Sequence, residues 1–172
     1  MTGESPMGSA RTALDRVATN VAVVTTYTNG HPHGSTANVW GEPDNGAMCL
    51  ITLRRGSISA EAVAGSGRFA ANILRADQID VALRFARREP EPGWRFTGVG
   101  FEEQSGCPVL LDSLAVLICT VESRIPFGEY EIFTGKIEDQ FLGRSAKPAL
   151  FYDRHFWSTE SSPRKTTDGT SG

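Results

Sequence analysis

Three short segments of the chain combine residue types that could hold a flat ligand with a phosphate tail. The first, Gly-Ser-Thr-Ala-Asn-Val-Trp at 34–40, is a strand-like run of small and hydroxyl-bearing residues. Small side chains allow a planar ring to approach the backbone and to accept hydrogen bonds from its N–H groups. The same run also suits an ordinary edge strand, so it does not predict a site by itself.

The other two segments follow along the chain. In Leu-Arg-Arg-Gly-Ser-Ile-Ser at 53–59, Ser57 and Ser59 stand where a helix is expected to begin. Hydroxyls and unpaired amides at a helix start, with two arginines beside them, can bind a phosphate, although a plain helix cap uses the same residues. The third segment, Gly-Arg-Phe-Ala-Ala-Asn-Ile-Leu at 67–74, also fits a buried strand.

Other motifs indicate no further chemistry. Gly-Ser-Gly-Arg-Phe-Ala at 65–70 lacks the third glycine of a dinucleotide loop, and it follows a helix and precedes a strand, the reverse of the required order. His31 and His33 have no nearby carboxylate or cysteine in the sequence, which favours a solvated hairpin over a metal site. The chain contains no Gly-x-Ser-x-Gly elbow, so a hydrolase has no support.

Composition points to one globular domain. The chain has 172 residues and a net charge of −3, from 17 basic and 20 acidic residues, which argues against nucleic acid or an anionic membrane as the main partner. No apolar run reaches the ~20 residues of a membrane helix, and the first residues lack the layout of a signal peptide, so we expect a cytoplasmic protein. The three cysteines form no Cys-x-x-Cys pair, and Cys49 and Cys119 lie in apolar runs typical of a core.

The residue pattern predicts mainly strands. Helices are expected after caps at Ser9 and Asp77 and near 58–65. Strands are expected at 21–28, 33–40, 47–54, 68–74, 114–123, 130–141 and 149–152. Asn29-Gly30 predicts a tight hairpin, and the first three strands are expected to form a meander. Because most strands follow one another through tight turns, the fold class is mainly β, an antiparallel barrel with peripheral helices over 9–158, between disordered tails at 1–8 and 159–172.

Together, in this order and spacing, the segments resemble the flavin reductase-like family, whose members are FMN-binding split β-barrels. The matching stretches are VAVVTTYTNGHPHGSTANVW, MCLITLRRGSIS, SGRFAANIL, DQIDVALRFAR, FGEYEIFTGKI and FYDRHF. The likeness extends over about residues 10–157. The stretches RFAR and DRHF particularly resemble reductases that supply reduced flavin to monooxygenases of aromatic polyketide pathways.

The resemblance implies a homodimer with the flavin near the dimer interface. It implies that the edge of the flavin ring is lined by Thr36, Ala37, Asn38 and Val39. The flavin phosphate would be bound by Ser57 and Ser59. The ring or the ribityl chain would contact Ala71, Asn72 and Ile73. Arg84 and Arg87 on the second predicted helix suit a flavin phosphate or an FAD pyrophosphate, with solvated helix charges as the alternative.

The chain departs from the family pattern on the side expected for nicotinamide or substrate. Glu42 lies in a turn where the family usually has serines and prolines, and Gly128-Glu129-Tyr130 lacks the usual histidine. His155 and Phe156 stand where arginine and tyrosine are more usual. We therefore expect Glu42, Tyr130, His155 and Phe156 on that side of the site.

The resemblance implies hydride transfer from NADH or NADPH to N5 of FMN or FAD, with the reduced flavin passing to a partner monooxygenase. Such a reaction needs two rings stacked at roughly 3–3.5 Å and no catalytic acid, base or nucleophile, in agreement with the motifs present. Two alternatives stay open. The protein could retain its flavin and act on a quinone or polyketide-like substrate, or it could be a non-catalytic flavin-binding or interaction protein.

Overall fold

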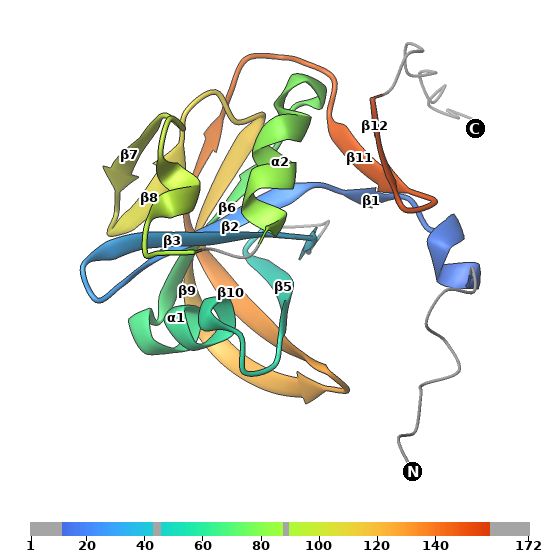
Figure 1. The fold of residues 1–172 in the computed structure, drawn as a ribbon. Coiled ribbons are helices and arrows are strands. Elements are labelled where there is room, and N and C mark those ends of the chain that lie inside the picture. The colour runs from blue at the N-terminus through green and yellow to red at the C-terminus, as the bar shows by residue number, and fades with distance from the viewer. Residues whose placement is uncertain (1–11, 43–45, 88–89, 159–172) are drawn as a thin grey trace, which may run out of the picture.

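The computed structural model describes residues 12–42, 46–87 and 90–158, and its centre is one curled antiparallel sheet (Figure 1). The strands of this sheet pair in the order β3-β2-β6-β9-β10-β5-β4. Their bounds are β2 Ala22–Thr28, β3 His31–Ala37, β4 Val39–Gly41, β5 Met48–Arg54, β6 Arg68–Ile73, β9 Ala115–Phe127 and β10 Tyr130–Leu142.

The two edges of the sheet belong to one segment of the chain. β3 forms one edge and β4 the other, and only Asn38 separates them. A sheet whose edges are joined in this way must curl, and it forms a barrel that is open where the chain passes from β3 to β4. The predicted mainly β, antiparallel split barrel is therefore confirmed.

The structure corrects two details of this region. The predicted strand at 33–40 is broken at Asn38, since the chain must leave one edge of the sheet to reach the other. The predicted meander is wrong beyond the β2–β3 hairpin, because β5 pairs with β4 and β10 and not with β3. The hairpin turn at Asn29-Gly30 is confirmed, and both residues have positive φ, 49° and 77°.

The helix α1 (Ile58–Ser66) lies across one end of the barrel (Figure 1). It begins at Ser57, whose hydroxyl accepts from the Ala60 amide at 3.1 Å, and it ends at Gly67 with φ 67°. This confirms the helix predicted near 58–65. A salt-bridge cluster joins α1 to the β9–β10 hairpin, because Arg124 on β9 contacts Glu61 at 2.6 Å and Glu131 at 2.7 Å.

The helix α2 (Ile79–Ala86) packs against β3 and β2. Asp77 does not cap it, contrary to the prediction, because Asp77 lies within a 3-10 turn (Ala76–Gln78) and its carboxylate pairs with Arg75 at 2.8 Å. Near the N-terminus, a 3-10 turn (Ala13–Arg16) replaces the predicted helix, and its predicted cap Ser9 lies outside the described residues.

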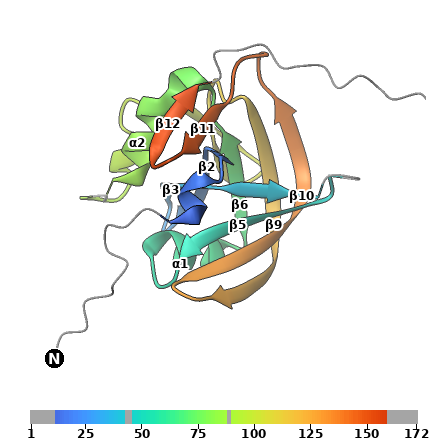
Figure 2. The same ribbon diagram turned by 90° about the vertical axis from the view of Figure 1, so that its right-hand side faces the viewer.

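The remaining elements are a hairpin and a small sheet that are separate from the barrel sheet. A hairpin of β7 (Phe101–Gln104) and β8 (Cys107–Leu110), which the sequence pattern missed, packs on β2 and β6. A small sheet in the order β1-β11-β12 contains β1 (Thr19–Asn20), β11 (Ala149–Tyr152) and β12 (His155–Ser158), and Figure 2 shows it beside α2 and β2. In the described ranges, no helix is long and apolar enough to span a bilayer.

The described core has three apolar clusters: one inside the barrel, one beneath α2, and one between β8 and the strands β6 and β9. Phe69 and Phe133 are the largest side chains of the first cluster, which also contains Cys49 and Cys119, so the prediction that these cysteines are core residues is confirmed. Gly135 on β10 makes room for this packing, because a Cβ there would lie 2.7 Å from Cζ of Phe69. Phe85 and Phe96 meet edge to face in the second cluster, with ring centroids 5.0 Å apart.

Candidate functional site

A groove with a volume of about 260 Å³ lies where the barrel is open. It brings together segments that are far apart in the sequence: the end of β3, the middle of β5, the start of β10 and the β11–β12 hairpin. Its lining residues are Val21, Thr36, Ala37, Asn38, Thr52, Tyr130, Phe151 and Phe156. The structure thus places three of the four predicted ring-edge residues in one groove with Tyr130 and Phe156, two residues predicted for the nicotinamide or substrate side.

The fourth predicted residue, Val39, is buried and does not line the groove. Asn20 on β1 holds its backbone on both sides: the Asn20 amide donates to the Val39 carbonyl at 2.6 Å and accepts from the Val39 N–H at 3.1 Å. Asn20 therefore fixes the point at which the chain leaves β3 for β4. Asn20 was not predicted, since nothing in the sequence pairs positions 20 and 39.

The far side of β3 is held by α2 and its neighbours. The Thr36 hydroxyl donates to the Ala82 carbonyl at 2.6 Å, so its proton is not available to a ligand in the groove. Gly34 lies against Phe85, and the guanidinium of the buried Arg95 donates to the Gly34 carbonyl. As an edge strand, β3 still presents alternate backbone groups to the opening.

A second part of the candidate site lies at the start of α1. Ser57 is the helix cap, and the Ser59 hydroxyl forms a hydrogen bond of 2.9 Å with Nε2 of His33. Within the described part of the chain, the amides of Ile58 and Ser59 have no acceptor, as expected in the first turn of a helix. These two amides and the Ser59 hydroxyl are groups that can bind an anion.

β3 connects the groove to the start of α1. Side chains alternate along a strand, so residues 33, 35 and 37 share one face of β3. The Cα atoms of residues 33 and 37 are about 13 Å apart at the usual strand rise. A ring in the groove and an anion at α1 are therefore separated by the length of a short flexible chain. Ser35, on the same face and partly buried, lies between them and was not predicted.

The predicted residues of β6 lie elsewhere. Asn72 is fully buried: its amide nitrogen donates to the Val23 carbonyl at 2.9 Å and to the Thr25 hydroxyl at 3.0 Å, and its oxygen accepts from the Leu110 amide at 2.8 Å. Ala71 is also fully buried, and Ile73 packs on the barrel cluster. None of the three lines the groove.

Arg84 and Arg87 line a different cavity, of about 400 Å³, on the outer side of α2. The Arg84 side chain donates to the carbonyls of Arg95 at 2.8 Å and Trp94 at 3.0 Å, and its guanidinium lies 4.7 Å from the centroid of the Trp94 ring. It therefore has local partners that fix the loop after α2. The structure does not bring these arginines to the groove or to the start of α1.

Two further predicted residues also lie outside the groove. Glu42 lines a separate cavity of about 270 Å³ with Trp40 and Met48, next to residues 43–45, which lie outside the described ranges. His155 is exposed, and its Nδ1 lies 2.6 Å from the Asp153 carbonyl. Phe156, by contrast, lines the groove and packs edge to face with Phe151, with ring centroids 5.2 Å apart.

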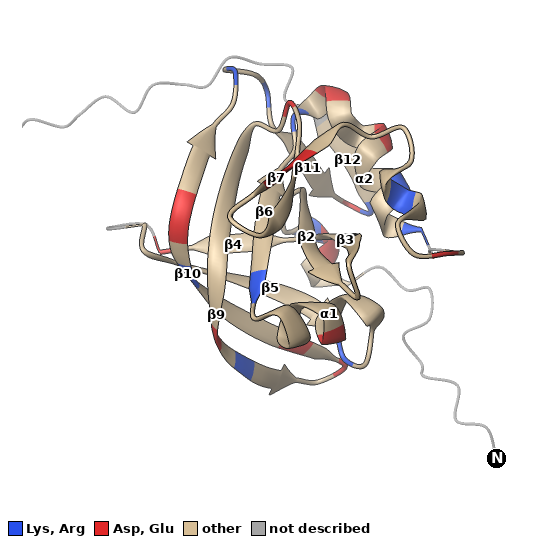
Figure 3. Cartoon of the chain, turned by 90° about the vertical axis from the view of Figure 1, so that its left-hand side faces the viewer, with Lys and Arg blue, Asp and Glu red and all other residues tan. Residues whose placement is uncertain are grey.

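The groove is lined by strand backbone and by mostly uncharged side chains, and it contains few ionisable groups. Among the described residues that line it, only Tyr130 has a titratable side chain, and none has a carboxylate, imidazole, amine or thiol. The described ranges contain no group of His, Cys, Asp and Glu that could hold a metal ion. Figure 3 shows that basic and acidic positions are spread over several elements of the ribbon. Such a groove suits a flat ligand that brings its own reactivity.

The family model of the flavin reductase-like domain matches residues 14–160 of the chain. A curated relative from Streptomyces coelicolor, "Actinorhodin polyketide dimerase", is 36% identical over 155 residues, which cover 87% of this chain and 84% of the relative. "Flavin-dependent monooxygenase, reductase subunit HsaB" from Mycobacterium tuberculosis is 32% identical and covers 91% of this chain and 83% of the relative.

Solved structures agree with these sequence matches. The structure of "Flavin reductase PheA2 in native state" is similar to this chain with a TM-score of 0.77 and 31% identity, covering 87% of this chain and 95% of that chain. The sequence and structural matches both extend over almost all of the described residues. The chain belongs to the flavin reductase-like domain family.

Proposed function

We propose that this protein is a cytoplasmic NAD(P)H-dependent flavin reductase, which passes a hydride from the nicotinamide of NADH or NADPH to FMN or FAD. The observation that carries this proposal is the groove at the end of β3, in a member of this family: it has open strand backbone, and its described lining residues include no carboxylate, imidazole, amine or thiol. A bound flavin would supply the electron-accepting ring, and the chain would supply its binding site.

The residues present fit a flavin. Ala37 and Asn38 at the end of β3 would leave room for the flavin ring to lie against the strand backbone. Thr52 on β5 would contact the ring from the other side of the groove. The amides of Ile58 and Ser59 and the Ser59 hydroxyl would bind the phosphate at the start of α1. Backbone donors of the β3 edge would stabilise negative charge on the pyrimidine side of the ring.

The nicotinamide would enter from the side of Tyr130 and Phe156. These side chains face the groove from β10 and β12, and Phe151 supports Phe156 from β11. They would exclude water and hold the two rings face to face, which is the main requirement of hydride transfer.

We propose that the reduced flavin is delivered to a partner monooxygenase. We also propose that the active form of the protein is a homodimer. The M. tuberculosis relative is named as the reductase subunit of a flavin-dependent monooxygenase, which favours this role. A diffusing reduced flavin needs no fixed contact between the two proteins.

The test is NADH and NADPH oxidation by the purified protein with excess FMN, FAD or riboflavin. We expect oxidation well above background with at least one flavin. Ala37→Leu, which fills the groove, should slow it, whereas Ala86→Leu, at the exposed end of α2, should not. No oxidation above background with any flavin would refute the proposal.

A second candidate is that the protein retains its flavin and reduces a quinone or polyketide-like substrate. It is favoured by the S. coelicolor relative, which is named as a polyketide dimerase. A yellow protein whose flavin survives desalting, with slow NADH and NADPH oxidation by free flavins, would support this candidate over the first.

A further inference from the structure

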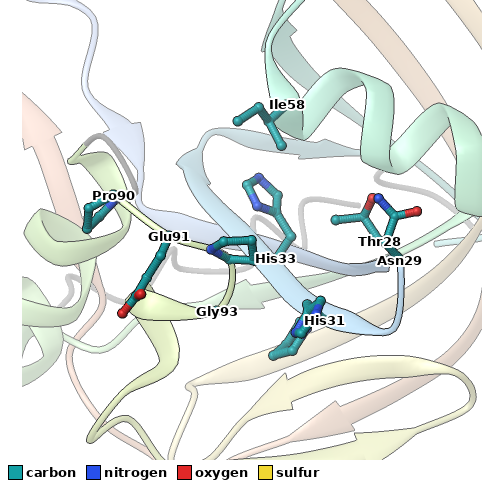
Figure 4. Close-up of a pocket in the computed structure, with 10 residues that line it drawn as sticks. Thr28, Asn29, His31, His33, Ile58, Pro90, Glu91 and Gly93 are labelled. Carbon is teal, nitrogen blue, oxygen red and sulfur yellow. The ribbon is translucent and has the colours of Figure 1, made fainter.

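His33 lies beneath the start of α1 and is almost entirely buried, with 4% of its surface exposed. It lines a cavity of about 290 Å³ between the β2–β3 hairpin, Ile58 and the loop at 90–93. Figure 4 shows its ring turned toward Ile58 in the first turn of α1, while His31 lies well away from that helix. A buried imidazole needs polar partners to offset its desolvation, and Ser59 provides one.

The contact between His33 and Ser59 determines what the serine can do. A hydroxyl has one proton to donate. If Nε2 of His33 accepts that proton, the hydroxyl has none left for a ligand. If Nε2 carries a hydrogen and donates it across the 2.9 Å contact, the Ser59 proton can point outward to an acceptor, and the chain of hydrogen bonds strengthens that donation.

We propose that His33 is a positioning residue, which donates from Nε2 to the Ser59 hydroxyl and so orients it toward the flavin phosphate. This inference rests on the proposed function, because Ser59 is a ligand only if a flavin binds. The ligand group is the terminal phosphate of FMN, or the corresponding phosphate of FAD. His33 would therefore affect flavins with a phosphate and leave riboflavin, which has none, unaffected.

The test compares dissociation constants of FMN and riboflavin, measured by quenching of flavin fluorescence. His33→Asn shortens the side chain so that its amide cannot take the place of Nε2, whereas the amide of His33→Gln can. We expect His33→Asn to weaken FMN binding on the order of 10-fold, as for the loss of one hydrogen bond to a charged group. Riboflavin binding should change less than about 2-fold, and His33→Gln should restore most of the FMN affinity.

Two controls separate orientation from structure. His31→Asn, in the same strand but exposed, should leave both flavins unaffected. In a Ser59→Ala background, His33→Asn should weaken FMN binding no further, because the group that it orients is gone.

Equal loss of FMN and riboflavin affinity in His33→Asn, or no loss of either, would overturn the inference. If His33→Asn does not fold, the comparison of Ser59→Ala with wild type decides, since unchanged FMN affinity there would also overturn it. These results differ from failure of the proposed function, in which the wild-type protein neither binds nor reduces any flavin.

Discussion

Replacing Asn72 with alanine should destabilise the barrel without weakening flavin binding by the molecules that remain folded. Asn72 lies on β6, between β2 and β9 in the centre of the sheet, and its side chain is fully buried. All three of its hydrogen bonds join strands: two go to β2, and the third accepts the Leu110 amide of β8.

The size of the effect follows from these contacts. Truncation leaves the Leu110 N–H buried without its acceptor, which costs about 1–3 kcal/mol, and each lost donated bond adds about 0.5–1.5 kcal/mol. Thr25 keeps other partners, because its hydroxyl also contacts the carbonyls of Ala70 and Pro108, so the lower part of the range applies. A loss of about 3 kcal/mol should lower the Tm by roughly 6–12 °C in a protein of this length.

The assay is thermal unfolding followed by circular dichroism, together with FMN titration well below the lowered Tm. Gln140→Ala is the matched control, since Gln140 is an amide residue with an exposed position on β10, and its Tm should stay within about 1 °C of wild type. An Asn72→Ala protein with an unchanged Tm and weakened FMN binding would refute this reasoning, and it would show that the amide contacts the ligand.

Further expectations concern packing, pH and thiol reactivity. Gly34→Ala should lower stability by about 1–3 kcal/mol in urea unfolding, because its Cβ would lie 2.9 Å from Cε1 of Phe85; equal stability would contradict the packing. The Arg75 guanidinium, which donates to the Asp77 carboxylate, holds the pKa of that carboxyl below its ordinary 3.8. The stability that this pair contributes is present above pH 3.8 and is lost as pH falls through the lowered pKa. The free energy of unfolding of wild type should therefore exceed that of Asp77→Asn at neutral pH, and this difference should disappear in acid. A difference that stays constant with pH would contradict the pairing. Burial raises the pKa of the Cys107 thiol, and the contact with Cys49 together with burial raises that of Cys119. The contact with Cys119 lowers the pKa of the Cys49 thiol, but Cys49 is buried like the other two. Because none of the three is accessible, all should react with an aromatic disulfide reagent only on unfolding, and rapid reaction of the native protein would contradict their burial.

The parts of the fold that depend on local sequence were predicted well. The β-branched run at 21–28, the Asn29-Gly30 turn and the helix start at Ser57 are local signals. The structure has a strand at Ala22–Thr28, the turn, and a cap at Ser57. The β7–β8 hairpin was missed because Phe-Glu-Glu-Gln at 101–104 has neither β-branched residues nor a clear alternation.

The site was predicted in part, because its geometry depends on contacts between distant residues. Thr36, Ala37 and Asn38 line the candidate groove, and their role in flavin binding stays a prediction. Closure of the barrel at Asn38 depends on Asn20 and on the pairing of β4 with β5. Asn72 is polar and lies in a segment that resembles the family, yet the central position of β6 buries it. The Arg84 guanidinium packs on the ring of Trp94, which lies in the irregular segment after α2. Residue periodicity does not predict a contact with an irregular segment.

The most direct test is a crystal structure of the protein grown with FMN. The ring is expected against residues 36–38 beside Thr52, with its phosphate in hydrogen-bond range of the Ser59 hydroxyl and of the first amides of α1. A ring bound instead beside Trp94 and Arg84, or a groove filled by side chains while FMN is present, would contradict the account.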